Sequence, residues 1–568
     1  MQDSRAIRRA LVLTLSLLST CAVGEPAARA GAPIQPTPPD SSGAYSAFLN
    51  AHFAASQADS NVAAQEYLRA LSAAPDSPDL LRQALMASIV SGRADAIGLA
   101  RRLPGDPMGQ ILLGNEAARS GDWQGAQQRF DSLPQTGVPK LLRPLLAAWA
   151  QQGAGQTDRA LARLEPLLSD QHFGSAYALH AALIADLAGR TADAARFYAK
   201  ASENLGFRSM RMAQILASFT ARQGHEAEAL RDIAGTAQAT PMLRIALPAL
   251  AANLRQRPVA SAMDGMAEAY LDVATALRQD NQDQFAMVLV QLALTVRPGF
   301  AAARMLGADV LEADGHADRA LQMLASIGAD NPLSAVVQMR RAELEARVGN
   351  QAEALQQLHD LSLAYSDSSL PDAEAGDILR MNGDYAGATA AYSRAIARIA
   401  APSALDWPLF YDRGVAYKQS NEWPKAEEDF QKALQLEPNQ PIVLNYLGYS
   451  WADRGEHLDD ARRMIESAAR QRPDDGAVID SLGWVMLRLG ETENAVRTLE
   501  RASELQPEDP TINSHLGDAY WAADRKMEAT YQWRRALTLN PLPADAAKLQ
   551  AKLHETTAQA TTQETHFP

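Results

Sequence analysis

Small residues and helix breakers recur at an almost constant interval in the C-terminal part of the chain. Prolines, glycines and alanines each return after 34 or 35 residues. The positions that keep this interval are Pro438, Pro473, Pro507, Pro541, Gly414, Gly448, Gly483, Gly517, Ala426, Ala461, Ala495 and Ala529. A self-similar period of this length indicates a stack of small units, each packed only against its neighbours. Such a stack typically offers a long surface rather than an enclosed catalytic pocket.

The same pattern predicts the local structure of each unit. From about Ala44 onward, alanine and leucine recur at helical spacing, and the alternation of β-branched residues that marks strands is missing. Over 407–541, one helix carries the repeating glycine, and a second helix ends at the repeating proline, which cannot continue a helix. A glycine inside a helix costs about 1 kcal/mol relative to alanine, so we expect close packing to compensate. We therefore predict an all-α fold of antiparallel helix pairs.

The motif within each unit resembles the tetratricopeptide repeat (TPR). It consists of leucine and glycine, a bulky residue, then alanine, a second bulky residue, alanine and proline. The resemblance is closest over 407–541 and extends in degenerate form over 44–400, for example in Gly114, Ala126 and Phe130. It implies a TPR-type α-solenoid, in which helix pairs stack into a right-handed superhelix with a concave groove.

Composition and repeats divide the chain into segments. We predict a signal peptide over 1–30, a proline-rich linker over 31–43, degenerate TPR-like repeats over 44–235 and 236–400, a well-defined TPR array over 401–541, a capping helix over 542–553 and a disordered tail over 554–568. The proline-bearing stretches 236–262 and 397–408 are the expected joints between the arrays. A final helix is expected because a solenoid needs its last unit covered.

The N-terminal segment has the parts of a secretory leader. Arg5, Arg8 and Arg9 precede an apolar run, and a small–x–small site ends at Ala30. Two outcomes are open. Cleavage after Ala30 would give a soluble periplasmic protein, whereas lipidation of Cys21 would hold the chain on the outer membrane facing the periplasm. A threonine before Cys21 departs from the usual lipobox residues.

Composition and motifs also exclude several functions. The net charge of −14 disfavours a nucleic-acid surface, which needs a basic stripe. Cys21 is the only cysteine, so neither an intrachain disulfide nor a cysteine-based zinc site can form. Phosphate-binding loops, dinucleotide fingerprints and nucleophile elbows are missing. We predict no enzyme activity, no cofactor and no metal, with other proteins as partners and contact with a membrane only through a lipid anchor.

Residues on the glycine-bearing helices predict a partner groove with aromatic anchors and a polar rim. The candidates are Tyr411, Lys418, Asn445, Tyr449, Asp480, Trp484, Arg488, Ser514 and Asp518. Bulky residues at helical spacing also form cores. For Tyr449 and Trp484 both interpretations stay open at this point.

Three strings have a narrower resemblance: LNYLGYSWADRGEHLDDARRMI, IDSLGWVMLRLG and HLGDAYW. They resemble exported bacterial TPR adaptor lipoproteins that partner a carboxyl-terminal processing protease. The resemblance implies a non-catalytic adaptor of the cell envelope that delivers substrates to a periplasmic protease. One alternative is a TPR scaffold for envelope polysaccharide export or assembly, which would share the architecture. The other, a repeat-bearing transferase, would need a second, differently patterned domain.

Overall fold

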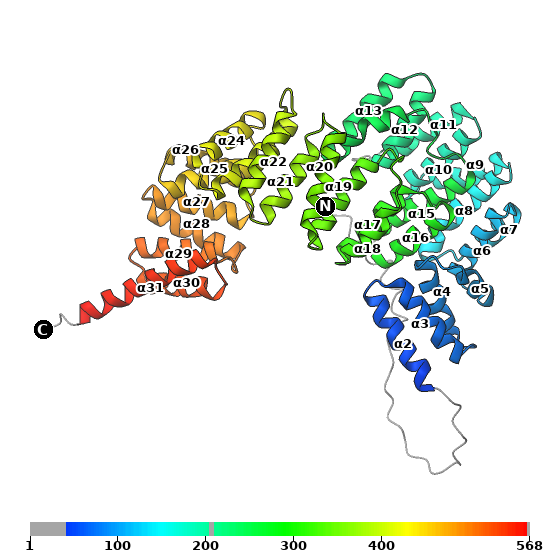
Figure 1. Cartoon of the computed structure of the whole chain (residues 1–568), viewed down its shortest axis with the longest axis horizontal. Coiled ribbons are helices and arrows are strands. Elements are labelled where there is room, and N and C mark those ends of the chain that lie inside the picture. Colours follow the sequence, from blue (N-terminus) through cyan, green and yellow to red (C-terminus); the bar gives the residue numbers. More distant parts are fainter. Residues whose placement is uncertain (1–40, 204–208, 565–568) are drawn as a thin grey trace, which may run out of the picture. The chain divides into compact units, whose positions relative to one another are not determined.

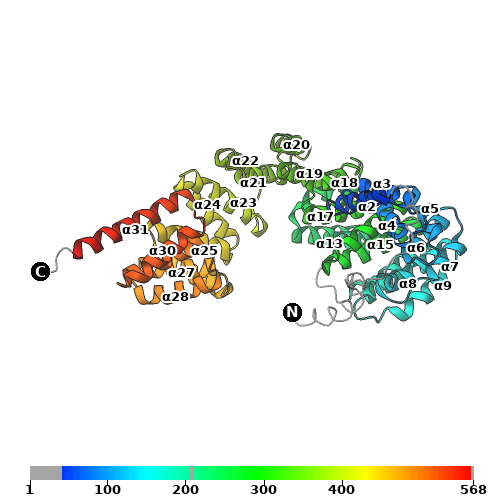
Figure 2. The ribbon, with the colours of Figure 1, turned by 90° about the horizontal axis from the view of Figure 1, so that it is seen from below.

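The computed structural model describes residues 41–203 and 209–564, and within these residues the secondary structure is helical without strands. Consecutive helices pair side by side, as α8 and α9 do in both views (Figures 1 and 2). The predicted all-α, TPR-type solenoid is confirmed. The predicted signal peptide, Cys21 and linker residues 31–40 lie outside the described residues, and α2 (Ser41–Ser56) begins inside the predicted linker.

Contacts between helices divide the chain into two compact units, Met1–Gln357 and Leu358–Pro568. In each helix pair we call the earlier member the first helix and the later member the second helix. The helices of unit 1 are α2, α3 (Ser60–Ala73), α4 (Pro78–Val90), α5 (Asp95–Arg102), α6 (Pro107–Arg119), α7 (Trp123–Asp131), α8 (Gly137–Gly153), α9 (Thr157–Leu164), η1 (Glu165–Leu167), α10 (Gly174–Leu187), α11 (Thr191–Ser202), α12 (Met210–Arg222), α13 (Glu226–Ala239), η2 (Pro241–Ala246), α14 (Leu247–Ala252), α15 (Ala262–Gln279), α16 (Asp283–Val296), α17 (Ala301–Ala313), α18 (Ala317–Ala325) and α19 (Ser334–Arg347).

Unit 2 starts within α20 (Gln351–Ala364). It continues with α21 (Leu370–Met381), α22 (Tyr385–Ala397), η3 (Ala404–Asp406), α23 (Trp407–Gln419), α24 (Trp423–Leu436), α25 (Pro441–Arg454), α26 (Leu458–Gln471), α27 (Gly476–Arg488), α28 (Thr492–Leu505), α29 (Pro510–Ala522), α30 (Lys526–Thr538) and α31 (Pro543–Glu564). The repeating prolines lie two or three residues after the second helices α24, α26, α28 and α30.

The division between the units falls in α20, where the sequence predicted no boundary. The proline-bearing stretch 236–262 forms η2 and α14, which bury Leu243, Ile245 and Leu250 against neighbouring helices of unit 1. The stretch 397–408 is likewise integrated into unit 2, because Arg398 donates hydrogen bonds of 2.8 Å to the carbonyls of Ser362 and Ser366. Both stretches therefore lie within a unit rather than between units.

The final helix is longer than the predicted capping helix. The sequence predicted a helix over 542–553 and a disordered tail after it, whereas α31 continues to Glu564. Residues 544–564 contain neither glycine nor proline and are rich in alanine and glutamine, which favour helices. Residues 565–568 lie outside the described part.

The repeating glycines allow each second helix to approach its first helix closely. A Cβ placed at Gly483 would lie 2.5 Å from Leu499 Cγ, a distance that no real packing tolerates. The equivalent contacts join Gly114 to Phe130, Gly376 to Tyr392, Gly414 to Phe430, Gly448 to Ile465 and Gly517 to Trp533. The repeating alanines Ala426, Ala461, Ala495 and Ala529 are fully buried beside them. A bulky side chain thus occupies the space that each glycine leaves empty.

Unit 1 packs one of its own helices across its first helices. In α15, Gly265 lies flat against the indole of Trp149 in α8, where an added Cβ would be only 2.2 Å from the ring. The Tyr270 hydroxyl donates a 2.7 Å hydrogen bond to Asn115 Oδ1 in α6, a partner 155 residues away. Figure 1 shows α15 beside α8 and α10. The exposed face of the first helices α6, α8 and α10 is therefore covered by α15, another helix of the same chain.

Ionic contacts fix α15 in this place. Glu268 is almost fully buried and accepts a 3.0 Å hydrogen bond from Arg211 Nε of α12. Arg297, which follows α16, also pairs with Glu268, at 3.5 Å. A buried carboxylate is stable only with such partners. Position and orientation of α15 are thus set by contacts to four successive first helices, α6, α8, α10 and α12.

We expect Gly483→Ala to destabilise unit 2 by about 1–3 kcal/mol, because the new methyl group overlaps Leu499. Thermal unfolding measures the effect. The matched control is Gly98→Ala within α5, where no atom lies within 4 Å of the added Cβ; it should raise stability by about 0.4–1 kcal/mol. Equal effects of the two substitutions would contradict the packing described here.

Gly265→Ala should loosen α15 from Trp149 at a cost of about 1–3 kcal/mol. Hydrogen exchange should then accelerate in α8 and α15 while α25 and α27 stay unchanged. Gly235→Ala in α13, where the added Cβ meets open space, is the control and should leave exchange as in the parent chain. Unchanged exchange in Gly265→Ala would mean that α15 does not depend on this contact.

Candidate functional site

The predicted groove residues lie on the first helices of four successive pairs in unit 2. Tyr411 and Lys418 belong to α23, Asn445 and Tyr449 to α25, and the remaining five to α27 and α29. Residues three or four positions apart share one face of a helix, so each helix presents its candidates in one direction. The structure extends this set with Tyr446 and His515. We call Tyr411, Lys418, Asn445, Tyr446, Tyr449, Trp484, Arg488 and His515 the partner face.

Tyr411 is a packed residue rather than a free anchor. Its ring centroid lies 5.6 Å from that of Tyr446, 5.9 Å from that of Phe430 and 6.1 Å from that of Trp407. Burial raises the pKa of its hydroxyl well above the usual value. Tyr411 thus forms the aromatic floor at one end of the partner face.

Lys418 lies half-buried above this floor. Its Nζ is 4.6 Å from the ring centroid of Tyr446 and 5.8 Å from that of Tyr449, within the range of cation–π attraction. Burial lowers the pKa of Lys418, and the charge of Asp453 opposes this shift. No carboxylate among the described residues lies within ion-pair distance of it.

An aromatic cluster forms the centre of the partner face. The rings of Trp484 and His515 are stacked, with centroids 4.2 Å apart and planes at 20°. Tyr449 lies 6.1 Å from the same imidazole. Trp484 and Tyr449 are both half-buried, so each combines packing with an accessible part. Packing is therefore shown for both side chains, and a role of their accessible parts in partner binding stays a prediction.

Asp480 holds the imidazole of His515 in place. Its carboxylate lies 2.8 and 3.0 Å from Nδ1 of His515, and both side chains are buried. Burial lowers the pKa of His515, but the charge and hydrogen bond of Asp480 outweigh it, and the net pKa is raised. Asp480 is thus committed to an internal contact and does not point to a partner as predicted.

Two buried polar atoms of the partner face have no hydrogen-bond partner among the described residues. They are Trp484 Nε1, a donor, and Asn445 Oδ1, an acceptor. An unsatisfied buried polar atom costs about 1–3 kcal/mol, and native structures contain few of them. They are two of twelve such atoms among the described residues, and they lie on neighbouring first helices of the partner face.

The remaining candidates differ in role. Arg488 donates a 3.0 Å hydrogen bond to the backbone carbonyl of Asp453 and lies 5.8 Å from the ring of Trp484. Asp518 accepts hydrogen bonds from Trp533 Nε1 at 2.9 Å and from Lys552 of α31 at 2.6 Å. Asp518 therefore fixes the capping helix. Ser514 is half-buried and makes no side-chain hydrogen bond within the described residues.

Tyr446 and His515 are not among the residues that the sequence predicts for the groove. Helical spacing places Tyr446 on the same face as Asn445 and Tyr449, so this residue could have been predicted. The place of His515 on a first helix already allowed a partner contact, but its stack with Trp484 of the neighbouring first helix could not be predicted. Sequence periodicity predicts which residues are neighbours within one helix. It does not predict which ring of the next first helix lies against them.

A second titratable cluster lies beside Tyr411. Arg380 of α21 pairs with Asp377 at 3.3 Å and with Asp412 of α23 at 3.7 Å. The Tyr392 hydroxyl donates a 2.6 Å hydrogen bond to Asp377. Burial raises the pKa of Asp412 to about 7, the charge of Asp377 adds to this, and Arg380 opposes it. The cluster joins the first helices of two neighbouring pairs.

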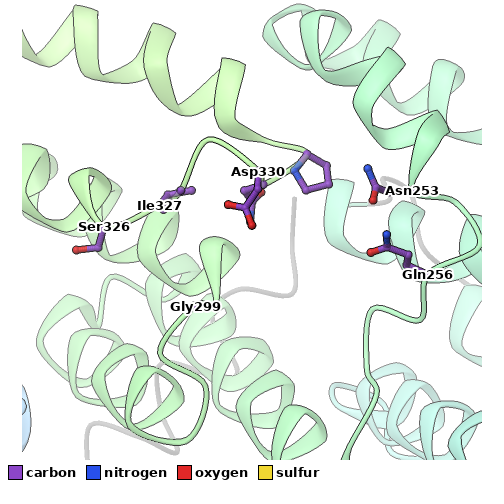
Figure 3. A pocket seen from close by; sticks show the side chains of 9 residues that line it. Asn253, Gln256, Gly299, Ser326, Ile327 and Asp330 are labelled. Atoms are coloured by element: carbon purple, nitrogen blue, oxygen red, sulfur yellow. The ribbon is translucent and has the colours of Figure 1, made fainter.

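No group of three or more histidine, cysteine, aspartate or glutamate residues in the described part could hold a metal ion. A polar cavity of about 450 Å³ lies in unit 1 (Figure 3). It is lined by Asn253, Gln256, Gly299, Ser326, Ile327, Gly328, Asp330, Asn331 and Pro332. These residues include no nucleophile–base pair. Across residues 41–203 and 209–564, no helix is both long and apolar enough to cross a membrane.

Three family models match the chain. One described as Tetratricopeptide repeat matches residues 407–440, one described as Tetratricopeptide repeat-like domain matches 249–406, and one described as TPR repeat matches 485–524. The matches cover parts of both units. They extend the repeat assignment from the regular array into the degenerate one.

Among characterised sequences, a TPR repeat-containing protein of Pseudomonas aeruginosa is 30% identical over 204 residues, which are 35% of this chain and 33% of that protein. Bacteriophage adsorption protein A of Escherichia coli strain K12 is 38% identical over 89 residues, 16% of this chain and 9% of that protein. The chain thus spans a third or less of the length of these relatives. Among solved structures, a chain of the APC/C hetero-tetramer Cut9–Hcn1 is 16% identical with a TM-score of 0.37, covering 90% of this chain and 96% of that one.

The stability of unit 2 should depend on the charge of Asp412. A carboxyl whose pKa rises from 3.8 to about 7 on folding binds a proton as the chain folds. The free energy of unfolding therefore falls as pH rises from 4 to 7 and stays lower above 7. Asp412→Asn should remove this loss of stability. The free energy of unfolding of this variant should exceed that of the parent chain by about 1–3 kcal/mol at pH 8, and should differ little from it at pH 4.

Thermal unfolding across this pH range measures the difference. Asp474→Asn, in an exposed loop of the same unit, is the control and should follow the parent chain at every pH. A constant offset between Asp412→Asn and the parent from pH 4 to 8 would contradict the raised pKa.

Proposed function

This chain is a tetratricopeptide-repeat protein, and from that premise we propose that it is a non-catalytic adaptor of the bacterial cell envelope. TPR arrays are surfaces for binding other proteins. In the proposed role the chain brings substrate proteins to a periplasmic protease, the role implied by the three C-terminal strings. Its location is the periplasm, or the outer membrane facing the periplasm where Cys21 is lipidated.

The observation that carries the binding role is the contrast between the two units. In unit 1 the first helices α6, α8, α10 and α12 are covered by α15. In unit 2 α31 lies near this row, with Asp545 close enough to Tyr449 to raise the pKa of its hydroxyl and Lys552 paired with Asp518. Even so, Asn445 Oδ1 and Trp484 Nε1 have no hydrogen-bond partner among the described residues. Half-buried aromatic residues with unsatisfied polar atoms beside them are suited to a protein contact that excludes water.

The leader supports the proposed location. A positive segment, an apolar run and a small–x–small site precede the described residues. The two outcomes predict different mature ends. A chain purified from its native envelope should begin at Gly31 after cleavage or at an acylated Cys21 after lipidation, and mass spectrometry of the N-terminal peptide distinguishes them. An intact N-terminus at Met1 would contradict export.

The adaptor role is tested by crosslinking the tagged full chain in its native envelope and identifying the captured proteins. We expect a processing protease together with cell-wall hydrolases. The double variant Tyr449→Ala/Trp484→Ala should lose these partners. The matched control is Met527→Ala/Tyr531→Ala on α30, whose side chains are 85% and 64% exposed on a second helix; it should retain them.

Thermal unfolding of both double variants is the control for folding. Transitions like that of the parent chain would mean that a loss of binding is not caused by unfolding. Capture of polysaccharide synthesis or export components instead would favour the alternative scaffold. Equal capture by the parent chain and by Tyr449→Ala/Trp484→Ala would place recognition elsewhere on the chain.

A further inference from the structure

The helix α2 carries large apolar side chains on its outer face. Tyr45, Leu49 and Phe53 follow one another at intervals of four residues. Their exposed fractions are 66%, 48% and 68%. Residues four positions apart lie on one face of a helix, so the three side chains form a continuous row. We call Tyr45, Leu49 and Phe53 the α2 stripe.

The inner face of α2 is made of small side chains. Ala47, Ala51 and Ala54 are buried on the side of α2 that packs against α3. A surface helix ordinarily turns its apolar stripe to the core and polar residues to solvent. In α2 the three alanines already fill the contact with α3, so the packing of unit 1 does not account for the larger side chains of the α2 stripe.

The position of α2 makes this exposure unusual. It is the first described helix of unit 1 (Figure 1), and the terminal repeats of a solenoid require a polar outer face to stay soluble. The capping helix α31 follows that rule, with Asp545, Lys548 and Lys552 in its first three turns. An apolar stripe on a terminal helix instead marks a surface that another molecule covers.

The charges at α2 restrict what can cover it. Its sixteen residues include no aspartate, glutamate, lysine or arginine. The next acids along the chain, Asp59 and Glu66, pair with Arg319 at 2.6 Å and with Arg69 at 3.7 Å. A charged partner of either sign therefore finds no counter-charge on α2. Helices that lie on a membrane surface are rich in lysine and arginine, which α2 lacks. The occupant is thus apolar and uncharged.

The α2 stripe is itself such a surface, and it is symmetric about Leu49. Tyr45 lies four residues before Leu49, and Phe53 lies four residues after it. A two-fold axis at Leu49 brings the two copies of Leu49 together and places Tyr45 of each copy against Phe53 of the other. Rows of residues four apart interdigitate in the commonest class of helix packing. A symmetric dimer uses one patch twice, so the patch must be complementary to itself in this way.

We propose that two copies of this chain form a symmetric dimer through the α2 stripe. The three side chains expose roughly 300–400 Å² in each copy. The pair consequently buries less than the about 1,200 Å² at which stable interfaces begin. The dimer is therefore weak and forms as the protein concentration rises. The partner face lies on other helices and takes no part, so dimerisation is a property beyond the proposed adaptor role.

Sedimentation equilibrium from low to high micromolar concentration tests for the dimer. The sample is the chain that begins at Gly31, which contains every described residue and no cysteine. We expect a reversible equilibrium in which the average mass rises from that of one chain toward twice that value. Leu49→Asp should weaken dimerisation at least tenfold, because two carboxylates would then meet in an apolar contact. Tyr531→Asp, at an exposed position of α30, is the control and should dimerise as the parent chain does.

A cysteine placed at the axis tests the symmetry of the contact. In Leu49→Cys the two thiols lie opposite each other, and mild oxidation should give a disulfide-linked dimer. Asn50→Cys is the matched control on the same helix. The next residue points about 100° away around the helix axis, so this variant should stay largely monomeric. Thermal unfolding of each variant should match that of the parent chain, since neither side chain is buried in unit 1.

Three results would overturn the proposal. A single chain mass at every concentration would mean that the α2 stripe does not join two copies, and that a lipid surface or another protein covers it. A dimer that persists in Leu49→Asp would place the interface elsewhere on the chain. Equal disulfide yields for Leu49→Cys and Asn50→Cys would contradict a two-fold axis at Leu49.

Discussion

The contact between a glycine of the first helix and a bulky side chain of the second helix sets how closely the two helices pack in α6/α7, α21/α22, α23/α24, α25/α26, α27/α28 and α29/α30. At Gly483 and Leu499, as at Gly114 and Phe130, the second helix approaches to a distance that no Cβ would allow. The same contact recurs in the regular pairs and in the degenerate pairs α6/α7 and α21/α22. First helices consequently follow one another, and their exposed residues form continuous rows.

The two units use these rows differently. In unit 1 the row is covered by α15, which seats Gly265 on Trp149 and is held by Glu268 and Arg211. A buried, fully partnered ion pair of this kind fixes one position for the helix. In unit 2 the matching row keeps aromatic rings half-buried and leaves Trp484 Nε1 without an acceptor. The row of unit 2 also has a helix of the chain beside it, α31, whose Lys552 pairs with Asp518, but it keeps unsatisfied polar atoms, and this difference connects the fold to protein binding.

The helix pairs, the packing positions and the helices that carry the partner face could all be predicted from the sequence, because they follow from a local period. The internal ligand α15 could not, since nothing local shows that Tyr270 meets a side chain 155 residues away. The role of Asp480 was likewise hidden, because its partner His515 lies in the next first helix. The division within α20 was missed because proline-bearing stretches such as 236–262 pack into a unit instead of linking two.

Hydrogen exchange on the full chain tests the contrast between the two units most directly. The chain is purified from its native cells with its bound proteins and compared with the same chain after those proteins are removed. The account predicts added protection in α25, α27 and α29, with α8, α10 and α15 equally protected in both samples. Protection gained mainly in α8, α10 and α15, or on the second helices of unit 2, would contradict it.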